Sequence, residues 1–273
     1  MNRFIISIFT ILIFTFYVKM SAAEVLFVEA EIAGVNNLVN ELTVPATSGE
    51  EGDFEIFACV TRIDSPNSFS NATPNWNNFN LGECGGPNCI LGIFTKFSPE
   101  PNNVDSTCFW DNPTRPSVGT VLRYRGVDGS TPITASACTS GIGGFATSPS
   151  LNTNPGSLVV RIFGANENFS NEQFNNLPGN SEFGKTQGVS NFESTTANLF
   201  TYGEPFPNGG LAEEVSLDYE VVDTAWRACT IVLAMPSASA AQVPTLSEWG
   251  LIAMAGILGL VGFMVISRRK LIA

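Results

Sequence analysis

Acidic side chains are the residues of this chain whose types and spacing could support catalysis. The 273-residue sequence contains no histidine, so a Ser-His-Asp triad, a Cys-His pair and histidine ligation of a metal are excluded within one polypeptide. Two carboxylates could still hydrolyse a glycosidic bond, and acids cluster at 50–53, 213–214 and 218–220. We interpret these clusters as solvated strand edges and turns. The sequence therefore predicts a protein that is not an enzyme and that uses no cofactor and no metal.

Cysteines are the second set of reactive side chains, and their even number indicates disulfides formed in an oxidising compartment. They are Cys59, Cys84, Cys89, Cys108, Cys138 and Cys229. We expect Cys84 and Cys89 to close a small loop, Cys108 to pair with Cys138, and Cys59 to pair with Cys229, which is one of fifteen connectivities. A zinc site of four thiolates is the alternative, although the spacings lack a Cys-x-x-Cys pair.

Strand periodicity dominates the segment that must position these groups. The clearest alternation runs over 215–221, where Val215, Leu217, Tyr219 and Val221 fall on one face. The other predicted strands are 25–32, 54–62, 90–97, 118–125, 157–163 and 228–235, separated by turn-rich segments at 65–80, 99–116 and 148–156. The pattern predicts an all-β fold, an antiparallel β-sandwich of one domain. A two-domain β arrangement divided near 148–156 is the alternative.

The charge of this β-rich segment is strongly acidic. Residues 24–242 contain 8 basic and 24 acidic side chains, a net charge of −16. Such an excess opposes binding to nucleic acid and to anionic lipid, and it favours solubility and contact with basic partners. We expect no nucleic-acid partner.

The N-terminus has the layout of a secretory signal peptide. Arg3 supplies a positive charge, residues 4–18 form an apolar stretch, and Ser21, Ala22 and Ala23 are the small residues of a cleavage site. We expect signal peptidase to cut after Ala23. An uncleaved anchor is the alternative.

The C-terminus has the layout of a membrane anchor. An apolar run extends from Leu251 to Ile266 and is followed by the basic residues Arg268, Arg269 and Lys270. At about 1.5 Å per residue, this run extended to Trp249 and Ser267 approaches the ~30 Å of a bilayer core. The basic cluster then stays in the cytoplasm, which places the body on the outer face of the membrane.

A short motif precedes this run, after a small and uncharged linker at 236–242. It consists of Val243, Pro244, Thr245, Leu246, Ser247, Glu248, Trp249 and Gly250. The segment resembles the IPTL-CTERM sorting domain, a relative of the PEP-CTERM signals that exosortases process in Gram-negative bacteria; Val243 departs from the leading isoleucine of the pattern. The resemblance implies that a membrane-embedded, cysteine transpeptidase-like enzyme cuts near residues 244–246.

These features predict four parts: a signal peptide (1–23), a β-rich exported domain (24–235), a flexible linker (236–242) and a sorting signal (243–273). We expect an exported bacterial cell-surface or extracellular matrix protein, anchored transiently by its C-terminal helix, whose body has a structural or interaction role. Its expected partners are the membrane, signal peptidase and an exosortase-type enzyme.

Two other functions stay open from the sequence. In the first, the body is an adhesive module that binds surface glycans, with Trp76 and Phe79 of the Asn-rich segment 71–80 stacking on sugar rings. The alternative for these two rings is that they pack beneath a long loop. In the second, the body is a carboxylate-dependent glycoside hydrolase.

Overall fold

The structure, a computed structural model, describes residues 24–36, 39–62, 69–72, 75–86, 89–98, 104–114, 116–167, 185–192, 195–219, 221–236 and 256. The predicted signal peptide, the linker beyond Pro236 and the sorting signal, Gly256 apart, lie outside these ranges. Within them, no helix has the length and apolarity that a membrane span requires. The chain separates into one unit that ends at Pro236, called the body below, and a second that begins at Ser237.

The first half of the body forms one five-stranded and one three-stranded antiparallel sheet. Its strands are β1 (Leu26–Val35), β2 (Val39–Val44), β3 (Phe54–Arg62), β4 (Phe69–Ala72), β5 (Asn77–Glu83), β6 (Cys89–Phe97), β7 (Ser106–Thr114) and β8 (Ser117–Arg125). The first central sheet has the order β1-β8-β3-β6-β5, and the first outer sheet has the order β2-β7-β4.

The second half repeats this plan. Its strands are β9 (Ile133–Ile142), β10 (Phe145–Ser148), β11 (Leu151–Thr153), β12 (Ser157–Ala165), β13 (Thr186–Phe192), β14 (Thr195–Phe206), β15 (Gly210–Ala212), β16 (Val215–Asp218) and β17 (Ala225–Leu233). The second central sheet has the order β13-β14-β12-β17-β9, and the outer strands pair as β10 with β16 and β11 with β15.

Both halves have the strand order of an eight-stranded jelly roll, except that the fifth strand joins the central sheet beside the sixth. In each central sheet the first strand of the half pairs with the last, the last with the third, and the third with the sixth. The outer sheets pair the second strand with the seventh, and in the second half each of these is broken into two short pieces. Among the described residues the second half has no counterpart of β4, and residues 168–184 lie outside the described ranges. The body is thus two jelly rolls in tandem.

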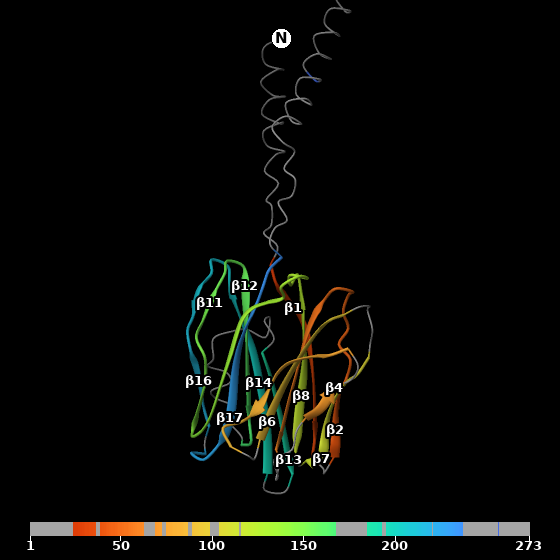
Figure 1. The fold of residues 1–273 in the computed structure, drawn as a ribbon, viewed down its shortest axis with the longest axis vertical. Coiled ribbons are helices and arrows are strands. Elements are labelled where there is room, and N and C mark those ends of the chain that lie inside the picture. The colour runs from red at the N-terminus through yellow and green to blue at the C-terminus, as the bar shows by residue number, and fades with distance from the viewer. Residues whose placement is uncertain are drawn as a thin grey trace, which may run out of the picture. The chain divides into compact units, whose positions relative to one another are not determined.

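The two jelly rolls pack together through their central sheets. The largest core cluster contains Ile56 and Leu122 of the first sheet and Ile162, Leu199 and Ile231 of the second, and all five are buried. Figure 1 shows the outer strands on opposite sides of the central pair, with β11 and β16 on one side and β2 and β4 on the other. The central strands are therefore covered on both faces.

Burial on both faces helps to explain some of the strands that the sequence revealed. The strands β3, β8 and β12 are buried along nearly their whole length, and apolar side chains lie on both faces of each. Their predicted ranges agree with the structure, and the all-β, antiparallel class is confirmed. The expected loops at 65–80 and 99–116 are wrong in part, because β5 begins at Asn77 and β7 spans Ser106–Thr114.

The strand predicted at 215–221 is shorter than expected. The strand β16 ends at Asp218. Leu217 and Tyr219 are buried as the alternation predicted, but Val221 is 43% exposed. Tyr219 N still donates to Gly144 O, and the chain turns at residues 222–223, where Thr224 Oγ1 donates to Val221 O at 2.7 Å before β17 begins.

All six cysteines form disulfides, and the connectivity differs from the expectation. The bonds are Cys59–Cys108, Cys84–Cys89 and Cys138–Cys229. The Cys84–Cys89 pairing is confirmed, whereas the Cys108–Cys138 and Cys59–Cys229 pairings are wrong. Cys59 on β3 faces the outer sheet, where β7 carries Cys108, and Cys138 is the register partner of Cys229 on neighbouring strands. Each bond therefore stays within one jelly roll.

Candidate functional site

The residues predicted to act in sorting flank the body at both ends. The motif 243–250, the basic cluster 268–270 and the cleavage residue Ala23 lie outside the described residues. Glu24 and Pro236 are the described residues of the body nearest to them in sequence. We call the region around these two residues the stem end, made up of residues 24–25, 126–132, 155–158, 205–207 and 234–236.

Three stretches of backbone converge at the stem end. Ala234 N donates to Pro132 O at 2.9 Å, and Asp128 N donates to Ala234 O at 2.9 Å. Gly126 has a φ of 75°, and a Cβ atom there would lie 2.7 Å from the carbonyl oxygen of Glu24. The link between the two jelly rolls therefore holds the residues that begin and end the body.

A side chain in the link fixes its conformation. The Oδ1 atom of Asp128 accepts hydrogen bonds from Ser130 N at 2.7 Å and from Thr131 N at 2.8 Å. This is the side-chain-to-backbone pattern by which aspartate stabilises a turn. The link is ordered by its own residues, so it can act as a fixed anchor for the last strand.

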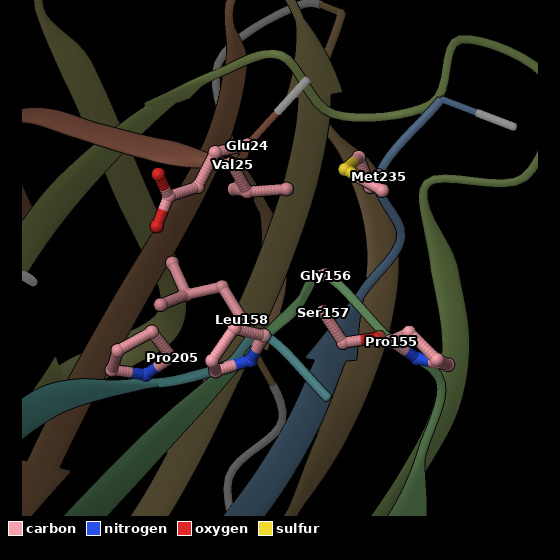
Figure 2. Close-up of a pocket in the computed structure, with 9 residues that line it drawn as sticks. Glu24, Val25, Pro155, Gly156, Ser157, Leu158, Pro205 and Met235 are labelled. Atoms are coloured by element: carbon pink, nitrogen blue, oxygen red, sulfur yellow. The ribbon is translucent and has the colours of Figure 1, made fainter. Parts of the chain in front are cut away.

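An apolar pocket of about 270 Å³ opens at the stem end. Its lining consists of Glu24, Val25, Pro155, Gly156, Ser157, Leu158, Pro205, Pro207 and Met235. Figure 2 shows Glu24, Val25 and Met235 on one side of the pocket, opposite Leu158 and Pro205. Gly156 has a φ of 80°, and a Cβ atom there would lie 2.5 Å from the Met235 methyl carbon. The lining is mainly apolar, and Glu24 is the one carboxylate in it. Such a pocket is suited to binding an apolar group rather than to acid–base chemistry, which needs a second titratable group.

Acidic residues from the 213–214 cluster line a second, polar recess of about 440 Å³. Glu213 and Glu214 are exposed, and Glu204 is partly exposed at the same recess. Its wall includes the buried Arg161, which donates to Ser148 Oγ at 2.7 Å and to the backbone oxygen of Glu213. The glutamate side chains therefore face solvent, while the arginine is bound by neutral acceptors.

The 50–53 cluster was interpreted as solvated, which is wrong for Asp53. Asp53 is 2% exposed, and it accepts two hydrogen bonds from Arg125, at 2.9 Å from Nε and 3.1 Å from Nη2. Burial alone raises the pKa of Asp53, but the hydrogen bonds from Arg125 and from the backbone of Glu50 outweigh it and hold the pKa below its ordinary value.

A second buried ion pair lies beside Asp53. Arg123 and Glu55 are register partners on β8 and β3, they are 1% and 2% exposed, and their side chains form a salt bridge. Lys96 Nζ lies 2.9 Å from the other carboxylate oxygen of Glu55. Charged residues inside predicted strands, Glu55 in β3 with Arg123 and Arg125 in β8, are the sequence signal that could have revealed this network. Its groups are paired with one another, as expected of a structural element.

Trp76 is covered and so is not placed to stack on a sugar. It is 9% exposed, its ring lies 5.3 Å from the ring of Phe57, and Lys96 Nζ lies 4.4 Å from its centroid. Phe79 is half-buried and packs against the central core. Of the two alternatives for Trp76, the structure supports packing, because its ring lies against Phe57 of β3 and Lys96 of β6.

Comparison with known proteins identifies the C-terminal segment. A family model described as the IPTL-CTERM motif matches residues 241–270. Comparisons with curated proteins and with solved structures find no match. The match covers the motif 243–250, the apolar run and the basic residues, which are the features from which the resemblance was drawn. Residues 241–270 therefore carry the IPTL-CTERM motif, a C-terminal sorting signal of exported proteins.

Proposed function

We propose that this chain is an exported bacterial surface or matrix protein whose body acts by structure or interaction. In this proposal a signal peptide delivers the body, the segment 251–266 holds it at the inner membrane, and an exosortase-type enzyme cuts the chain near residues 244–246. The observation that carries the proposal is the IPTL-CTERM match at 241–270.

The geometry of the stem end supports this order of events. Glu24 and Met235 line one pocket, so the two segments to be processed leave the body from the same end. Ala234 is held by two backbone hydrogen bonds, and the seven residues of the linker 236–242 span at most about 25 Å when extended. The proposed cleavage segment 244–246 thus follows Pro236, the last described residue of the body, within ten residues along the chain.

The disulfides and the ion pairs support a body that works outside the cell. Three disulfides form within the described residues, as in proteins that fold in an oxidising compartment. The buried acids Asp53 and Glu55 are each bound by arginine, so they stabilise the fold and are not available to a substrate. We infer a role in surface structure or contact for the body.

Intact-mass measurement of the protein from its native host, with and without the sorting enzyme, tests the proposal. We expect the exported form to begin at Glu24 and to end near residues 244–246, and the strain without the enzyme to retain Ala273. The variant Pro244→Ala/Leu246→Ala should retain Ala273 in both strains, because the extended cleavage segment is lost. Ala240→Ser in the linker is the matched control and should be processed normally. A wild-type protein that still ends at Ala273 in the strain with the sorting enzyme would overturn the proposal.

A further inference from the structure

Exposed apolar side chains gather at two turns of the second jelly roll. Single exposed apolar residues are normal on a protein surface, whereas a cluster of them marks an interaction site. Among the described residues, four of the ten exposed large apolar side chains lie at these turns. They are Ile142, Phe145, Val221 and Val222, which are 62%, 62%, 43% and 74% exposed. We call the surface that these four residues form the tip.

Backbone contacts hold the two turns together. Gly143 N, in the turn between β9 and β10, donates to Thr224 O at 2.9 Å, and Tyr219 N donates to Gly144 O. A Cβ atom on Gly144 would lie 3.9 Å from the Cα atom of Val222. The turn between β9 and β10 and the turn before β17 therefore form one continuous surface.

The tip lies at the opposite end of the second jelly roll from the stem end. The strand β17 begins at Ala225, beside the tip, and ends at Leu233, directly before Ala234 of the stem end. Nine residues of strand span about 30 Å. Figure 1 shows the turn that leads into β17, in blue, at the lower end of this strand. The tip is therefore remote from the residues that begin and end the body.

Acidic side chains lie beside the apolar ones at the tip. Phe145 and Asp218 are register partners on β10 and β16, so their side chains share one face of this strand pair. Asp223 is exposed in the turn before β17. The segments 133–148 and 215–225 contain no lysine and no arginine. The tip thus combines apolar contact with uncompensated negative charge.

The disulfide-closed loop 84–89 of the first jelly roll borders this surface. A Cβ atom on Gly86 would lie 3.5 Å from Ile142 Cδ1. Glu83, directly before the loop, is exposed and adds a further carboxylate. Arg227 does not neutralise the tip, because its guanidinium donates to two oxygen atoms of β5.

We infer that the tip is a docking surface for a basic protein segment that carries apolar side chains. The apolar side chains of the segment cover Phe145 and Val222, while its lysines or arginines face Asp223 and its acidic neighbours. A second copy of this chain and an anionic membrane both meet like charge here, whereas a basic segment meets opposite charge. This inference rests on the interaction role proposed above for the body and assigns that role to a surface.

Titration of the exported protein with synthetic peptides tests the inference. The probe is a helix-forming peptide with leucine on one face and lysine on the other. One control peptide replaces lysine by glutamate, and a second replaces leucine by serine. Calorimetry should detect binding of the lysine–leucine peptide that weakens as ionic strength rises, because salt screens the charges. Each control peptide should bind at least about tenfold more weakly.

A pair of apolar substitutions locates the contact. Phe145→Ser/Val222→Ser should weaken binding of the lysine–leucine peptide roughly tenfold, because apolar area is lost from the tip. Val104→Ser/Leu211→Ser is the matched control, since these side chains are 60% and 56% exposed but lie outside the tip. The control variant should bind as the wild type does.

A pair of charge substitutions tests the acidic part of the surface. Glu83→Gln/Asp223→Asn should weaken binding about fivefold and should reduce its dependence on salt. Glu213→Gln/Glu214→Gln removes two exposed carboxylates outside the tip and should leave binding unchanged. All of these side chains are exposed, so the melting temperature of each variant should match that of the wild type.

Three results would overturn the inference: no binding of the lysine–leucine peptide, equal losses in the tip variants and their controls, or a dimer that Phe145→Ser/Val222→Ser dissociates. The last result, measured by sedimentation equilibrium, would assign the tip to a second copy. The intact mass of the same sample separates this test from that of the proposed function. Correctly processed termini without peptide binding would refute the docking surface alone.

Discussion

At the scale of the residue, the body stabilises charges that its sequence suggests should be solvated. Asp53, Glu55 and Arg123 are buried between the first central sheet and its cover, and each has an oppositely charged neighbour. The sequence predicts the strands that contain Glu55 and Arg123. It does not show that the sheet face on which these two side chains lie is covered by another segment. Their burial depends on the segment at Thr47, whose hydroxyl accepts from Arg123 Nε at 2.8 Å.

Asp53 should make stability depend on acid. Its pKa in the folded protein lies below the ordinary value of 3.8, so its contribution is fully present above that value and is lost as pH falls through the folded pKa. We expect Asp53→Asn to lower the free energy of unfolding by about 2 kcal/mol near neutral pH.

Urea denaturation between pH 6 and pH 2 measures this effect. The difference between wild type and Asp53→Asn should shrink as pH falls below about 4. Glu51→Gln, which removes the charge of an exposed neighbour, is the control and should follow the wild-type curve. A gap that stays constant down to pH 2 would refute the role of Asp53.

At the scale of the element, burial on both faces made some strands visible in the sequence but not all, because the central strand β14 is buried over 197–203 and was not predicted. The fully covered β3 and β12 are mainly apolar, each interrupted by buried charge at Glu55 or Arg161, and were predicted within two residues of their bounds. The edge strand β9 and the outer strand β7 are rich in Ser, Thr, Asn and Ala, and they were missed. Their strand conformation comes from pairing with β17 and β2, which no local pattern encodes.

The disulfides should differ in what they contribute, because they close chain segments of different length. Cys59–Cys108 joins a central to an outer sheet across 49 residues, whereas Cys84–Cys89 spans 5. From loop entropy we expect Cys59→Ala/Cys108→Ala to lower the free energy of unfolding by about 4 kcal/mol and Cys84→Ala/Cys89→Ala by about 2 kcal/mol.

Chemical denaturation of the two double variants, each beside wild type, provides the measurement. The short-loop variant is the control for the loss of two sulfur atoms from buried positions, since Cys84 and Cys89 are as buried as Cys59 and Cys108. Equal losses would show that packing rather than chain restriction sets the contribution of these bonds.

At the scale of the whole molecule, the repeat exists in strand order and not in matching residues. The two halves share the order of their central sheets, yet the disulfide that leaves the central sheet in the first half has no counterpart in the second, where Cys138–Cys229 joins neighbouring central strands. The sequence therefore predicted one sandwich. The division near 148–156 that was its alternative lies inside the second half, and the halves meet at 126–132.

The shared core should make both halves unfold together. Leu122 of the first central sheet is fully buried in the cluster that contains Ile162 and Ile231 of the second. We expect Leu122→Ala to lower the free energy of unfolding by about 3 kcal/mol. Because the cluster is common to both halves, we expect the first and the second jelly roll to be destabilised by the same amount.

Hydrogen exchange measured by mass spectrometry separates the two halves. In Leu122→Ala, the slowly exchanging amides of β3 and those of β12 should exchange faster by the same factor. The control Val222→Ala alters a side chain that is 74% exposed and should leave both unchanged. Faster exchange confined to the first half would show two independent domains.

The contacts between Glu24, the 126–132 link and Ala234 bring the beginning, the middle and the end of the body's chain to one place. Joining residue 235 to residue 24 through a short peptide and opening the chain at Gly129 gives a circular permutant in which the second jelly roll precedes the first. Every strand keeps its neighbours in such a molecule, so the order of the halves along the chain is not dictated by the architecture.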